Sequence, residues 1–102
     1  MRLYIDVSLF TPASAVGRVS GAMDFPSLPR VGEIVSLAQA AVPGAEFSGQ
    51  LAVTDVIHSP TSSGQEPMLS LADIVSPTEA LAQAMGHSLE QSYGLFFEPY
   101  EK

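Results

Sequence analysis

Hydrophobic and polar residues alternate along the first ten positions of the chain. Leu3, Ile5, Val7 and Leu9 occupy every second position, and most residues between them are polar. Because successive side chains of a β-strand point to opposite faces, this period of two is typical of a strand with one buried face. The pattern predicts a half-buried strand over residues 2–10.

Residues 11–25 fit two structures. A Thr-Pro pair at the start of this segment suits a short helix, whereas residues 17–25 alternate in the manner of a strand. Gly17 and Gly21 are both unfavourable inside a helix, because glycine loses much backbone entropy when it becomes helical. We therefore favour a strand over residues 17–25.

A corner with little conformational freedom follows in the stretch FPSLPRVGEIVSL, residues 25–37. Pro26 and Pro29 each fix their own φ angle and favour an extended conformation in the residue before them. Gly32 permits a bulge or a positive φ angle, and the residues after it favour a strand. We interpret the stretch as a bend that leads into a strand over residues 33–37, and not as a binding site.

The longest strand signal comes at residues 50–58, where both sets of alternating positions are largely apolar. Such a pattern is typical of a central strand that is covered on both faces. A polar turn over residues 60–67 separates it from a strand over residues 68–75, and we expect these strands to pair as an antiparallel hairpin. Residues 38–47 predict a loop or a single helical turn. One face of the 50–58 strand is expected to carry Leu51, Val53, Asp55 and Ile57.

A helix is predicted between residues 76 and 94. Ser76 suits the N-cap, Pro77 the first helical position, and Glu79 the third position after the cap. Gly94 suits the C-terminal cap, because glycine readily adopts the left-handed conformation needed there.

One side of this helix is apolar. Leu81, Met85 and Leu89 are spaced four residues apart, and we expect all three to be buried against a sheet. Gly86 lies beside them, although glycine costs about 1 kcal/mol relative to alanine in a helix. We expect either a kink at this glycine or the close approach of a neighbouring backbone.

Alternating segments followed by one capped helix favour an α+β fold. We expect a single domain over residues 1–102, with a strongly curved antiparallel sheet, or a partly closed small barrel, of about five strands. The C-terminal helix packs on that sheet. At the level of fold, the segments PRVGEIVSL and VTDVIH are similar to short barrels of bacterial or phage proteins.

The charge of the chain bears most directly on its partners. Eleven acids stand against four bases, which gives a formal net charge of −7 and a pI near 4.4. The bases form no cluster, whereas nucleic acids and anionic membranes both require grouped Lys and Arg. We therefore expect neither of these partners. The acidic charge has two alternative interpretations: it keeps a small protein soluble, or it steers association with a basic protein partner.

The sequence also bears on location. It contains no cysteine, and no apolar stretch approaches the roughly 20 residues that span a bilayer. The N-terminus has the pattern of a strand and not of a signal peptide. These features fit the reducing conditions of the cytoplasm.

Residues that carry chemistry are few. His58 and His87 are the only histidines, and neither belongs to a His-x-Glu or Glu-x-x-His pair. There is no G-x-S-x-G nucleophile elbow and no Gly-rich phosphate loop. We expect no metal, no cofactor and no catalytic residue, which favours a protein that is not an enzyme.

The C-terminal stretch LFFEPYEK is the best candidate for a binding surface. Phe96, Phe97 and Tyr100 are aromatic, and Glu98 and Glu101 lie beside them. Aromatic side chains among acids suit a basic or apolar protein groove better than a nucleic acid. The same aromatic side chains also suit packing in the core, with the stretch as a short edge strand.

Two classes of function follow from these observations. The first is a non-enzymatic protein-interaction module, a small acidic domain that binds a basic protein partner as inhibitors do. The second is a small-ligand-binding barrel or minor enzyme, with a pocket between helix and sheet near Asp55 and His58. A structural homo-oligomer is compatible with either class. A flat surface of acids and aromatics favours the first class, and a cavity lined by convergent polar groups favours the second.

Overall fold

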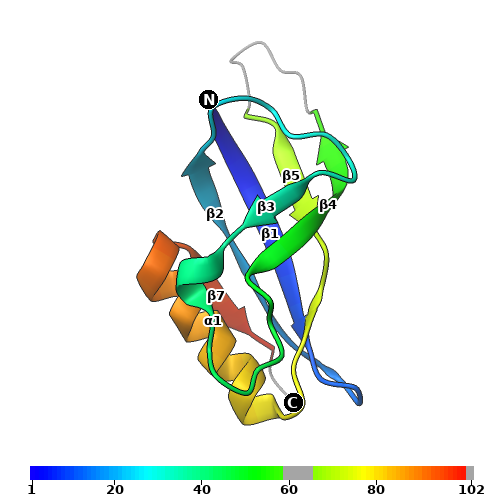
Figure 1. Cartoon of the computed structure of the whole chain (residues 1–102), viewed down its shortest axis with the longest axis vertical. Coiled ribbons are helices and arrows are strands. Elements are labelled where there is room, and N and C mark those ends of the chain that lie inside the picture. Colours follow the sequence, from blue (N-terminus) through cyan, green and yellow to red (C-terminus); the bar gives the residue numbers. More distant parts are fainter. Residues whose placement is uncertain (59–65, 101–102) are drawn as a thin grey trace.

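The sheet is built around the N-terminal strand β1 (Arg2–Phe10), which pairs on both of its sides (Figure 1). The structure is a computed structural model and describes residues 1–58 and 66–100. The strand order is β3-β4-β5-β1-β2-β7, and β6 also pairs with β1. The other elements are β2 (Ala15–Asp24), β3 (Ile34–Ser36), the 3-10 turn η1 (Ala38–Ala40), β4 (Gln50–Ile57), β5 (Met68–Leu71), β6 (Ile74–Val75), the helix α1 (Glu79–Tyr93) and β7 (Phe96–Pro99).

The sheet is larger and more open than the predicted barrel. The α+β class is confirmed, with one helix on the sheet, but the sheet has seven strands and does not close. It is also mixed and not antiparallel, because β5 and β6 both run parallel to β1. The helix α1 contacts both β7 and η1, the turn that follows β3. The helix therefore occupies the space in which the end strands β3 and β7 would have to pair in order to close the sheet.

Both N-terminal strands are confirmed. The four apolar residues predicted to point inward from β1 are fully buried. The strand β2 begins at Ala15, so the helical alternative for this segment is wrong. The hydroxyl oxygen of Thr11 accepts hydrogen bonds from the backbone N–H groups of Ala13 and Ser14, which forms a tight turn between the strands.

The predicted hairpin of β4 and β5 is confirmed, but a bulge changes the faces of its side chains. Val53 lies opposite Leu71, whereas Asp55 lies opposite Ser70, so β4 contains one extra residue between these pairs. A shift of one residue moves each later side chain to the other face of the sheet. Asp55 and Ile57 therefore point outward, and their predicted placement on the face of Val53 is wrong. Both are exposed, so β4 is not covered on its two faces.

The predicted strand over residues 68–75 is divided. The strand β5 ends at Leu71, and β6 covers only Ile74–Val75 at the end of β1. Residues 59–65, which make up most of the predicted polar turn, lie outside the described residues.

The proline corner leads into β3 as predicted, although β3 is shorter than residues 33–37. The backbone N–H of Arg30 donates to Glu33 Oε1 over 2.6 Å, and the N–H of Glu33 donates to the carbonyl of Arg30 over 3.0 Å. Gly32 lies inside this turn with a φ of 93°, a conformation that favours glycine. The single helical turn predicted within residues 38–47 is η1.

The helix begins two residues later than predicted. Its N-cap is Thr78, whose hydroxyl oxygen accepts from the N–H of Leu81 over 3.2 Å. The predicted cap, Ser76, is buried, and its hydroxyl donates to the carbonyl of Ala45 over 3.0 Å. That bond fixes the loop after η1 to the start of α1. The C-cap is Gly94 with a φ of 68°, as predicted.

The apolar side of α1 packs on the inner face of the sheet, mainly on β2 and β7. Met85 and Leu89 are fully buried, which confirms their predicted position. Leu81 is only half-buried, because it lies in the first turn, beside the 41–48 loop at Gly44.

Candidate functional site

The strand β7 divides the predicted aromatic surface between the two sides of the sheet. Phe96 is 61% exposed, whereas Phe97 is only 6% exposed. The alternation of side chains along a strand sends Glu98 to the same side as Phe96. Tyr100 follows the end of β7 and is exposed, and Glu101 lies outside the described residues. Phe96, Glu98 and Tyr100 are thus available to a partner, and Phe97 is not.

Phe97 is held in the core by two glycines. A Cβ atom added at Gly86 in α1 would lie 2.6 Å from Cδ1 of the Phe97 ring, and one added at Gly17 in β2 would lie 2.8 Å from Cε1. The ring therefore fills a slot between helix and sheet that any larger residue would close. The ring of His87 also packs edge-on against it, with centroids 5.2 Å apart. The close approach predicted at Gly86 exists, but it is made by a side chain and not by backbone.

The side of the sheet opposite α1, here called the outer face, carries two parallel rows of side chains. Residues paired across neighbouring strands point to the same face. The register aligns an apolar row, in which Tyr4 lies between Ala22 and Met68 and Met68 lies opposite Ile57. The adjacent row begins at Phe96 on β7. It continues through the polar side chains of Ser20, Asp6, Ser70 and Asp55.

These rows form one continuous surface across five strands. Neighbouring strands lie about 4.8 Å apart, so the apolar row extends over roughly 14 Å. Tyr4 and Ile57 are both exposed in it. The hydroxyl of Tyr4 donates to Ser20 Oγ over 3.3 Å, which joins the two rows and orients the Tyr4 ring. On the next row, Glu98 lies opposite Arg18. The outer face therefore carries exposed apolar side chains beside the carboxylates of Asp6, Asp55 and Glu98, and Arg18 lies on it as well.

Sequence reasoning missed the centre of this surface. Tyr4 and Phe10 were the two aromatic residues among the otherwise polar positions of their strand, and that irregularity was the available signal. Ile57 gave no signal, because only the bulge in β4 turns it outward.

The alternative site is not assembled. Asp55 lies on the outer face, away from α1, and His58 is exposed at the end of β4. Neither residue lies between helix and sheet. Among the described residues, no group of three or more His, Asp or Glu side chains is gathered as a metal site requires.

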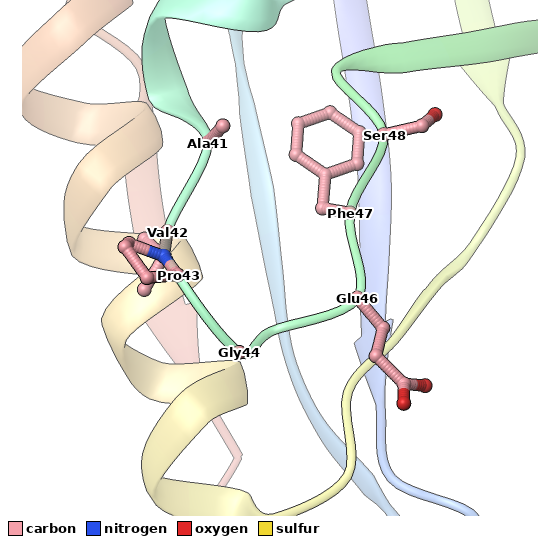
Figure 2. A pocket seen from close by; sticks show the side chains of 7 residues that line it. All are labelled: Ala41, Val42, Pro43, Gly44, Glu46, Phe47 and Ser48. Carbon is pink, nitrogen blue, oxygen red and sulfur yellow. The ribbon is translucent and has the colours of Figure 1, made fainter.

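A shallow hollow exists elsewhere, along the loop of residues 41–48 (Figure 2). Ala41, Val42 and Pro43 form one wall, and the ring of Phe47 lies across from them. The carboxylate of Glu46 and the hydroxyl of Ser48 both point away from the space between these walls in Figure 2. The hollow thus lacks the convergent polar groups of a site for a small polar ligand.

Comparisons with known proteins give no relative for this chain. A scan of protein-family models, a search of curated proteins and a search of solved structures each found no match. In the described part of the chain, α1 is not long and apolar enough to cross a membrane. The function is therefore inferred from the outer face itself.

Proposed function

We propose that this protein is a non-enzymatic interaction module whose outer face binds a basic protein partner. The observation that carries the proposal is the apolar row of Tyr4, Met68 and Ile57 beside the carboxylates of Asp6 and Asp55. Large apolar side chains anchor protein interfaces, and an excess of one charge around them favours partners of the opposite charge. The acids Asp6, Asp24, Asp55 and Glu98 outnumber Arg2 and Arg18 on this face. A net charge of −7 on so small a domain accelerates its encounter with a basic surface.

The two kinds of side chain have separate roles in this proposal. Exposed ion pairs contribute only about 0–1 kcal/mol each, so the carboxylates govern the association rate more than the affinity. Affinity comes from Tyr4 and Ile57 at the centre and from Phe96 at one end. The surface is also rigid where Phe96 is presented, because the buried ring of Phe97 holds β7 in place. A rigid surface loses less conformational entropy on binding.

Site-specific crosslinking tests the proposal directly. A photoreactive amino acid in place of Ile57 or Phe96 should capture the same basic protein from a lysate. The matched control is the same substitution at Gln83, which is exposed on α1 on the other side of the sheet. Capture from Gln83 as efficiently as from Ile57, or capture of unrelated proteins at the two outer positions, contradicts the proposal.

Kinetics with the captured partner separate the two roles. Between about 50 and about 500 mM salt, the association rate should fall steeply, because the Debye length shrinks from about 14 Å to about 4 Å. Asp55→Lys should slow association, whereas Ile57→Ala should mainly speed dissociation. Gln83→Lys changes the net charge by one unit, half the change that Asp55→Lys makes, and should slow association by much less than half as much on a logarithmic scale. A rate that does not depend on salt removes the basis for a steered basic partner.

A further inference from the structure

The two edge strands of the sheet differ in their free hydrogen-bonding groups, and β7 is closed. The N–H of Tyr100 donates to the carbonyl of Val16 over 2.9 Å, which fixes the pattern of the ladder between β7 and β2. In an antiparallel ladder alternate residues bond to the neighbour. The main-chain groups of Phe97 and Pro99 therefore face the free edge. The N–H of Phe97 donates to Glu90 Oε2 over 3.0 Å, and Pro99 has no N–H. No free donor remains on this part of β7.

The strand β3 ends the sheet on the other side, and it is open. The N–H of Val53 donates to the carbonyl of Glu33 over 2.9 Å, and the N–H of Leu37 donates to the carbonyl of Gly49 over 2.6 Å. Odd-numbered residues of this segment therefore bond to β4. The main-chain groups of Ile34 and Ser36 face away from it.

Because β3 is last in the strand order, these groups have no ladder partner among the described strands. In Figure 1, β3 runs alongside β4 and crosses in front of β1.

The β3 edge is only three residues long and follows a bulge at Gly32 and Glu33, but it carries no Lys or Pro. Natural proteins cover exposed edges or place Lys, Pro or bulges on them, because an open edge pairs with other chains. Ile34 is 58% exposed and Val31 is 63% exposed beside this edge. The charged residues nearest in sequence are Glu33, whose carboxylate accepts from the N–H of Arg30, and Arg30 itself, which is exposed. An open edge with two exposed aliphatic side chains has the features of a strand-binding site.

We propose that the β3 edge binds an extended, basic segment of a partner protein as an added strand. The segment forms main-chain hydrogen bonds with Ile34 and Ser36, and it places an apolar side chain beside Ile34. A second copy of this chain is disfavoured as the occupant, because each copy carries a net charge of −7. The same charge favours Lys and Arg in the bound segment. This site is separate from the outer face, and it stands or falls independently of the proposed function.

A displayed library of 12-residue peptides, selected on the intact chain, supplies the probe. Selected peptides should be rich in Lys, Arg and β-branched residues. Ser36→Pro removes the outward N–H without removing a bond to β4, and it should weaken the selected peptides about tenfold or more. Ser36→Ala keeps the N–H and should bind within about twofold of the parent. Phe96→Ala, on the outer face, should also leave the affinity unchanged.

Amide measurements on the parent protein keep the test independent of variant folding. The N–H groups of Ile34 and Ser36 should become protected from exchange when a selected peptide binds, and methylation of the facing peptide nitrogens should abolish binding. Failure to select a basic peptide, protection confined to β7, or equal affinity for a folded Ser36→Pro variant overturns the proposal. Self-association that Ser36→Pro abolishes assigns the edge to a second copy and overturns the assignment to a partner segment.

Discussion

The edges at β3 and β7 have opposite chemistry, although both are short strands at the ends of one sheet. On β7 the outward N–H groups are bonded or absent, and side chains such as Phe96 are what a partner meets. On β3 the outward main-chain groups of Ile34 and Ser36 have no ladder partner among the described strands, and the exposed side chains of Ile34 and Val31 lie beside them. The difference shows that the two ends of one sheet present different groups, exposed side chains at β7 and free main-chain groups at β3. Under the two proposals above, the molecule would separate recognition by side chains from recognition by main chain.

The closed edge depends on Phe97 more than on any other residue. Its ring fills the slot between α1 and β2, and its N–H is bonded to Glu90 on the same helix. The helix therefore fixes both the position of β7 and the closure of its edge. Variants around Phe97 should open this edge, and variants at Ser36 should close the other.

The largest effect is expected for Phe97→Ala. Loss of a buried aromatic ring should lower the free energy of unfolding by about 3–5 kcal/mol. Phe96→Ala is the matched control, because it removes the same side chain from the adjacent exposed position, and it should cost less than about 1 kcal/mol. Urea denaturation of the two variants measures the difference. Similar losses in the two variants mean that Phe97 is not the residue that holds β7.

Gly86→Ala should produce the next largest effect. The new methyl group would lie 2.6 Å from the Phe97 ring, and such overpacking costs about 1–3 kcal/mol. This outweighs the gain of up to about 1 kcal/mol that alanine brings to a helix. Adding Phe97→Leu to Gly86→Ala should recover part of the loss. If Gly86→Ala stabilises the parent protein, the ring does not occupy the slot.

The sequence predicted those features that depend on local periodicity. Three such features are the strand β1, the β4–β5 hairpin and the left-handed cap at Gly94. Each depends on the types of a few neighbouring residues. A strongly curved sheet or a partly closed barrel was expected, but the sheet is open. Whether the end strands meet depends on where α1 packs, which local periodicity does not determine. The parallel pairing of β1 with β5 likewise joins segments that are far apart in the chain.

The candidate site could be predicted only in part. Alternation indicates that Phe96 and Phe97 point to opposite sides, but the choice of the buried one depends on Gly17 and Gly86 in distant elements. Gly86, an unexpected residue inside a helix, was the sign in the sequence of its contact with Phe97. The outward turn of Ile57 depends on a bulge that hydrophobic patterning does not reveal.

A smaller effect is expected for Glu90→Ala. Its carboxylate accepts from the N–H of Phe97, and it also lies 3.6 Å from Nδ1 of His87. Loss of the part-buried hydrogen bond should cost about 1 kcal/mol. His87→Phe removes the Nδ1 contact with Glu90 but keeps an aromatic ring beside Phe97, and it should cost less. Glu90→Gln keeps an acceptor and should retain most of the stability. Chemical denaturation of the three variants orders them, and a larger loss in His87→Phe than in Glu90→Ala contradicts the role of this bond.

The smallest effect on stability, and the most specific test of the comparison, is expected for Pro99→Ala. The substitution restores an outward N–H at the free edge and removes no hydrogen bond, so the free energy of unfolding should change by less than about 1 kcal/mol. In a Glu90→Ala background both outward donors of β7 become free, and strand pairing between molecules becomes favourable. Sedimentation velocity at increasing protein concentration should then show more self-association than either single variant shows. Adding Ser36→Pro to every chain removes the β3 edge from the measurement, so that any remaining association belongs to β7. If the double variant associates no more than the parent, Glu90 and Pro99 do not protect this edge, and the contrast between the two edges reduces to the exposed aliphatic side chains beside β3.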